Sequence, residues 1–96
     1  MVSVNDVYTF HEDPGHGWLE VPRAALVELG IAHRITGYSH QAGQVVYLEE
    51  DCDAGTFVRA WEVYVGQPWS HVANSVTRHT NGDSGIRGCA QYKHGK

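Results

Sequence analysis

The fold is decided by the stretch VVYLEEDCDAGTFVRAWEVYVG, residues 45–66. Residues 45–49 combine β-branched and aromatic side chains and predict the strongest strand of the chain. Asp51 or Asp53 then predicts the N-cap of a helix, whose unpaired N–H groups and positive dipole end favour a carboxylate. Gly66 predicts the end of that helix. An apolar stripe at helical spacing marks the side that we expect to be buried: Phe57, Trp61, Tyr64 and Val65.

A similar unit precedes this stretch. Residues 7–10 are β-branched and aromatic, as strands prefer, and residues 18–21 predict the return strand. Between them, the sequence DPGHG at 13–17 has the proline and the glycines of a turn. Pro22 stands where a short helix begins, because the first helical position needs no N–H, and Gly30 supplies its left-handed end.

The two units together predict the fold class. Residues 35–40 predict a strand that precedes the one at 45–49, so that strand, strand and helix occur in this order at 7–30 and again at 35–66. We expect an α+β fold of the ββα–ββα type, in which a four-stranded antiparallel sheet carries both helices on one face. Trp18 or Tyr47 would then lie on the other face, covered by the C-terminal part of the chain or by a partner.

Residues 67–96 form an irregular extension of this single domain. Apolar side chains at helical spacing predict a weaker helical segment within 67–78, and residues 79–85 have the composition of a loop. Residues 86–92 are a candidate for a fifth strand, although Gly88 weakens that interpretation.

Composition excludes several classes of function. The chain has 96 residues, with 7 Lys and Arg against 11 Asp and Glu and a net charge of −4, which argues against direct nucleic-acid binding. No apolar run approaches the roughly 18 residues of a membrane span, and the N-terminus lacks the apolar stretch of a signal peptide. We therefore expect a cytoplasmic protein without a membrane partner, in which Cys52 and Cys89 are reduced thiols.

The motif HEDPGH at 11–16 gathers two imidazoles and two carboxylates. A zinc-protease helix needs its histidines four residues apart, whereas His11 and His16 are five apart and Pro14 and Gly15 prevent a helix. A non-helical metal site would need ligands from elsewhere in the chain. The motif has two other interpretations: it is a solvated hairpin tip, or it is a recognition loop.

The acidic run EEDCD at 49–53 admits three interpretations. A calcium loop starting at Asp51 fails, because Gly55 takes a position that must carry a ligand. Helix capping and an acidic docking surface both remain. For catalysis, Cys52 is a candidate nucleophile, but the sequence shows no serine elbow, Walker loop or dinucleotide fingerprint.

The stretches VYTFHEDPGHGWLEVP, ELGIA and VYLEEDCDAGTFVRAWE resemble a family of short uncharacterised proteins of bacterial genomes, phages and plasmids. The resemblance covers residues 7–65 and carries over no catalytic or binding residue. It implies an accessory protein of a mobile genetic element. Such proteins often act by occluding a larger host machine, as anti-CRISPR inhibitors do, and this last step is an analogy.

We therefore expect a non-enzymatic inhibitor without a cofactor, which binds a larger host protein or complex that has a basic surface. Its acidic contact residues would be Glu12, Asp13, Glu49, Glu50 and Asp51, and its aromatic anchor would be Trp69. Two alternatives stay open. One is a small metal- or thiol-dependent enzyme, and the other is a homo-oligomeric regulatory protein such as a homodimer.

Overall fold

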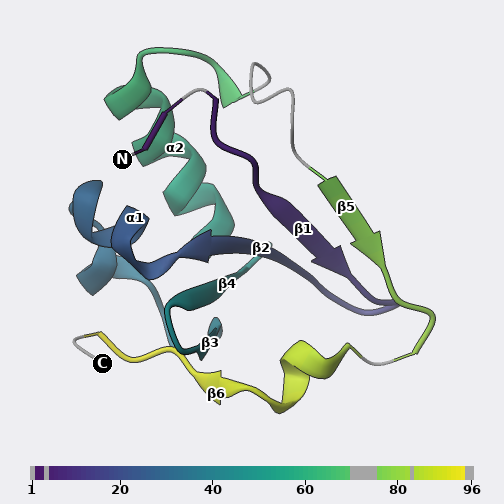
Figure 1. The fold of residues 1–96 in the computed structure, drawn as a ribbon. Coiled ribbons are helices and arrows are strands. Elements are labelled where there is room, and N and C mark those ends of the chain that lie inside the picture. Colours follow the sequence, from purple (N-terminus) through teal and green to yellow (C-terminus); the bar gives the residue numbers. More distant parts are fainter. Residues whose placement is uncertain (1, 4, 70–75, 83, 95–96) are drawn as a thin grey trace.

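One mixed sheet of six strands forms the centre of the computed structural model, which describes residues 2–3, 5–69, 76–82 and 84–94 (Figure 1). The order across the sheet is β5-β1-β2-β4-β3-β6, where the strands are β1 (Thr9–Glu12), β2 (Gly17–Pro22), β3 (His40–Ala42), β4 (Val45–Glu49), β5 (Val76–His79) and β6 (Ala90–Gln91). The helices are α1 (Arg23–Glu28), α2 (Asp53–Val65) and the short 3-10 helices η1 (Ala32–Arg34) and η3 (Gly85–Gly88). None of the helices in the described ranges is long and apolar enough to cross a membrane.

The α+β class is confirmed, but the expected sheet of four or five antiparallel strands is wrong in number and direction. The four expected strands are antiparallel neighbours in the order β1-β2-β4-β3, and a further strand is added at each edge. At one edge β5 runs parallel to β1, with Thr9 opposite Val76. Residues 76–78 were expected in a helical segment, and their backbone instead pairs with the open edge of β1. Residues 70–75, the middle of that segment, lie outside the described residues.

The candidate fifth strand at 86–92 is reduced to β6, which pairs only Ala90 and Gln91 with β3. The residues before it form η3, which closes when the N–H of Cys89 donates to the Ile86 carbonyl. The Ser84 side chain caps the start of η3 by accepting from the N–H of Ile86 at 3.2 Å. η3 therefore lies at the end of the sheet where the candidate site is found, and it contributes Arg87 to that site.

The expected strand at 35–40 is also wrong before His40, because Asp53 holds this segment in a turn. Asp53 is completely buried, and its Oδ2 accepts hydrogen bonds from the Thr36 N–H, the Thr36 hydroxyl and the Ser39 hydroxyl. Asp53 is therefore not the N-cap of α2, and Asp51 is not either. Cys52 stands at that position without a capping side-chain hydrogen bond.

Both helices pack on one face of the sheet and enclose a single core. Leu19 of β2 is opposite Leu48 of β4, so their side chains share a face, and both belong to one buried cluster with Leu26 of α1 and Phe57 of α2. Of the predicted helical stripe, Phe57 and Trp61 are fully buried, whereas Tyr64 is 49% exposed. Gly66 ends α2 in the left-handed conformation, with φ at 75°, as predicted.

The opposite face carries Trp18 and Tyr47, because these residues alternate with Leu19 and Leu48 along β2 and β4. Trp18 is nevertheless only 2% exposed, although it does not belong to the main core cluster. The C-terminal part of the chain covers Trp18, which is one of the two covers that the sequence predicted, the other being a partner. The Arg87 guanidinium of η3 lies 5.7 Å from the centre of the indole.

Candidate functional site

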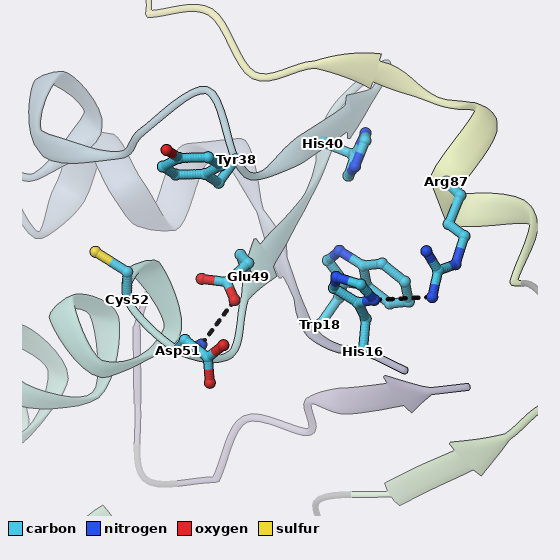
Figure 2. Close-up of a pocket in the computed structure, with 8 residues that line it drawn as sticks. All are labelled: His16, Trp18, Tyr38, His40, Glu49, Asp51, Cys52 and Arg87. Atoms are coloured by element: carbon cyan, nitrogen blue, oxygen red, sulfur yellow. Dashed lines mark hydrogen bonds between the residues drawn. The ribbon is translucent and has the colours of Figure 1, made fainter. Parts of the chain in front are cut away.

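A cleft of about 490 Å³ opens beside Trp18 on the sheet face away from the helices (Figure 2). We call it the Trp18 cleft. Four stretches that are distant in the sequence contribute to it: the β1–β2 turn with β2, the loop before β3 with β3, the end of β4 with the connection to α2, and η3. The lining residues are His16, Trp18, Tyr38, His40, Glu49, Asp51, Cys52 and Arg87.

Trp18 forms the apolar part of the cleft. The His16 ring stacks on the indole at 5.8 Å, with 14° between the ring planes, and the His40 ring meets it edge-on at 6.3 Å. Tyr38 is 76% exposed and so differs from the buried Trp18. An aromatic ring that is open to solvent beside a cleft offers contact area to a ligand at a small cost in side-chain entropy.

Arg87 is held in place by Asp13, whose carboxylate is completely enclosed. Arg87 donates from Nε to Oδ2 at 2.7 Å and from Nη2 to Oδ1 at 2.9 Å, which is the two-point geometry that guanidinium and carboxylate groups favour. The same carboxylate accepts backbone N–H groups from Gly15, His16 and Ser84. The Arg87 hydrogen bonds, followed by that of Ser84, hold the pKa of Asp13 well below its usual range.

The hydrogen bonds of the two imidazoles fix which ring nitrogen carries a proton. A guanidinium can only donate, so His16 Nδ1 accepts from Arg87 Nη2 at 2.8 Å, and His16 is neutral in this arrangement. A carbonyl can only accept, so His40 donates from Nδ1 to the Cys89 carbonyl at 3.0 Å. In a neutral His40, Nε2 is then the acceptor.

The other wall of the cleft is acidic. Glu49 Oε2 accepts the N–H of Asp51 at 3.0 Å, and the N–H of Glu49 donates to the Ser39 hydroxyl at 3.0 Å. Asp51 and the neighbouring Glu50 are exposed. Because Asp13 offsets the charge of Arg87, the Glu49 and Asp51 carboxylates leave the cleft with negative charge when the imidazoles are neutral.

The structure gathers only some of the predicted contact residues. Glu49 and Asp51 line the cleft with Glu50 beside them, whereas Glu12 lies at the end of β1, with Oε1 at 3.1 Å from His79 Nδ1. Asp13 is buried and out of reach of a partner.

The predicted anchor Trp69 packs inward. It is partly buried, its ring contacts Trp61 at 5.1 Å and Tyr8 at 5.4 Å, and its backbone N–H donates to the Glu62 carboxylate. Tyr38, His40 and Arg87 are the site residues that the sequence did not single out. The local sequence around Tyr38 has no feature that distinguishes an exposed tyrosine from a buried one, and Arg87 is 74 positions from Asp13.

The structure assembles no metal site among the residues that it describes. No three His, Cys, Asp or Glu side chains among these residues are grouped to hold a metal ion. His11 bonds Glu20 at 2.7 Å, while the bonds of His16 and His40 described above lead to Arg87 and to a backbone carbonyl. Cys52 is a free, exposed thiol.

Comparisons of the chain with protein-family models, with curated proteins and with solved structures find no match. The function must therefore be argued from the Trp18 cleft. Its free carboxylates and its exposed tyrosine are the groups that recognise a cationic side chain in other proteins.

Proposed function

We propose that this chain is a non-enzymatic protein that binds a basic surface of a larger protein through an acidic corner, which we define as Glu49, Glu50, Asp51 and Tyr38. One observation carries the proposal. Tyr38, at 76% exposure, lines the same cleft as the Glu49 and Asp51 carboxylates. An exposed aromatic ring with unneutralised acids beside it offers a cationic partner both contact area and opposite charge.

The charges of the site support a basic partner. Arg87 is the cation of the cleft, but its two hydrogen bonds to buried Asp13 offset its charge locally. The acidic corner therefore keeps its negative potential, which adds to the net charge of −4 of the chain. Complementary charge speeds encounter, and an aromatic anchor such as Tyr38 supplies much of the affinity once the partner is bound.

The resemblance to proteins of phages and plasmids suggests what kind of partner this is. Host machines that handle nucleic acids carry basic surfaces, because they must bind phosphate. A small acidic protein that covers such a surface would block the machine. Inhibition of a host defence complex, in the manner of an anti-CRISPR protein, is the form of this proposal that the resemblance favours by analogy.

An array of synthetic peptides graded in net charge tests the proposal. The wild-type protein is expected to bind the basic peptides and to be released by salt, because exposed charge pairs are screened. The double variant Glu50→Gln, Asp51→Asn is expected to lose most of this binding, since both side chains are exposed and their removal leaves the core intact.

The matched control is Ala24→Lys with Gln44→Lys, which changes the net charge by the same amount at exposed positions outside the cleft. This control is expected to bind like the wild type. Equal losses in both double variants would show that only net charge matters, and wild-type binding without preference for basic peptides would overturn the proposed function.

A further inference from the structure

We infer that the Trp18 cleft is a binding site for the guanidinium group of an arginine side chain supplied by the partner. This inference rests on the proposed function and goes further, because it names the side chain that enters the cleft. The observations that carry it are the contacts of Arg87 on one side of the cleft and the groups that face the cleft on the other side. Figure 2 shows Arg87 beside His16 and Trp18, with Tyr38, Glu49 and Asp51 opposite them.

The half of the cleft that Arg87 lines shows how this protein holds a guanidinium. Asp13 accepts two N–H groups along one edge, His16 Nδ1 accepts a third contact, and the Trp18 ring lies 5.7 Å from the central carbon. A carboxylate, an imidazole acceptor and an aromatic ring thus surround the planar cation. The carboxylate bound at two points and the aromatic face are partners that suit arginine better than lysine.

The other half presents two of these three kinds of group, because Glu49 and Asp51 provide carboxylates and Tyr38 provides an exposed aromatic ring. The His40 imidazole borders both halves from the Trp18 side, where its ring lies 6.3 Å from the indole. Because His40 donates from Nδ1 to the Cys89 carbonyl, the neutral ring keeps Nε2 as an acceptor. The volume of about 490 Å³ is in the range of sites that bind small ligands.

The balance of charge in the cleft also selects a cation. One carboxylate, Asp13, is neutralised by Arg87, whereas the carboxylates of Glu49 and Asp51 accept no side-chain cation among the described residues. An incoming guanidinium would offset one of these two negative charges and could donate to both carboxylates through its several N–H groups, which an anionic or an apolar ligand could not do.

The probe is N-acetyl-arginine amide, with N-acetyl-lysine amide as the comparison of equal charge. We expect the arginine amide to shift the NMR signals of the Trp18 indole N–H and the His40 ring in a saturable way, with affinity in the millimolar range that suits so small a ligand. The lysine amide should bind at least about fivefold more weakly, because it lacks the planar set of donors.

Two variants test the acidic and the aromatic contributions. Glu49→Gln keeps an acceptor for the Asp51 N–H but removes a charge, and it is expected to weaken arginine amide binding about tenfold. Tyr38→Ala is expected to weaken it severalfold. Glu12→Gln removes one charge outside the cleft and Tyr64→Ala removes a half-exposed tyrosine on α2, and neither should change the affinity.

The outcomes separate this inference from the proposed function. If basic peptides bind through the acidic corner while arginine amide causes no shifts, the guanidinium site is wrong and the docking function stands. Equal affinities for the arginine and lysine amides would also overturn the site as a guanidinium site. If neither peptides nor amide bind, both proposals fail.

Discussion

Asp13 links the β1–β2 turn to the C-terminal part of the chain. Its buried carboxylate accepts backbone N–H groups at 15, 16 and 84 as well as the guanidinium of Arg87. Asp53 acts in a similar way between α2 and the turn before β3, where it accepts from Thr36 and Ser39. Single buried carboxylates therefore fix the two loops on either side of the Trp18 cleft, and the shape of the cleft depends on them.

The first prediction concerns the acid stability that Asp13 contributes. Its pKa in the folded protein lies below the ordinary value of 3.8, chiefly because of Arg87, so folding favours the ionised form. The resulting stabilisation is complete above about pH 4 and is lost as the pH falls toward the folded-state pKa. We expect the free energy of unfolding in urea to fall steeply below about pH 4 in the wild type.

Asp13→Asn is the matched variant for this measurement. It should be less stable than the wild type at neutral pH but should show a weaker decline in acid. Some decline should persist, because hydrogen bonds from Tyr64 and from the Val2 N–H also lower the pKa of Glu28. An unchanged acid dependence in Asp13→Asn would contradict the account of this residue.

At the scale of elements, the sequence predicts well what an element's own residues encode. β4 is found at the predicted residues, and the paired burial of Phe57 and Trp61 in α2 follows from their spacing. β5 could not be predicted, because its partner β1 lies more than sixty residues earlier and no local pattern carries that pairing. The expected strand at 35–40 failed for the same reason, since a distant carboxylate overrides the local β propensity.

The candidate site also has one part that the local sequence encodes and another part that tertiary contacts decide. The acidic run containing Glu49 and Asp51 is visible in the sequence as a candidate docking surface. The enclosure of Asp13, the inward packing of Trp69 and the exposure of Tyr38 result from tertiary contacts, and composition and spacing do not contain them.

The buried stripe of α2 leads to a second prediction. Phe57→Ala is expected to lower the free energy of unfolding by about 3–5 kcal/mol, because the ring is fully buried in the core cluster. Tyr64→Ala, on the same helix but 49% exposed, should cost less than about 1 kcal/mol. Urea unfolding followed by circular dichroism measures both values. Similar losses in the two variants would contradict the orientation of α2.

The third prediction concerns η3 as a cover for Trp18. Arg87→Ala removes the guanidinium from the indole and leaves the Asp13 charge enclosed without its partner. We expect a red shift of tryptophan emission and a loss of stability clearly larger than that of Lys93→Ala, which removes an exposed side chain of the same segment. An unchanged emission maximum would show that η3 does not cover Trp18.

At the scale of the whole molecule, helices cover one face of the sheet, and the other face is closed only in part. The main core ties both helices and Tyr92 to the sheet, while the C-terminal part of the chain closes the opposite face at Trp18 through Arg87, whose guanidinium lies 5.7 Å from the centre of the indole. The acidic corner lies where this closure ends. The molecule thus pairs a well-packed helical side with an open acidic cleft.

The fourth prediction concerns alkaline stability. Burial and the nearby Asp6 carboxylate raise the pKa of Tyr8 well above its ordinary value of 10.0, and burial also raises the pKa of Tyr47 and Tyr92. The unfolded chain therefore loses these protons first, so their stabilisation is present below about pH 10 and is lost above it. The free energy of unfolding should decline above about pH 10, and less so in Tyr8→Phe. Equal declines would contradict the burial of Tyr8.

Docking through the acidic corner is tested most directly by the salt dependence of binding to one arginine-rich peptide, measured by fluorescence anisotropy. The account predicts that the affinity of the wild type falls steeply as salt rises. The double variant Glu50→Gln, Asp51→Asn should bind more weakly at low salt and with a much flatter dependence. Equal affinities and equal salt dependences for the two proteins would contradict it.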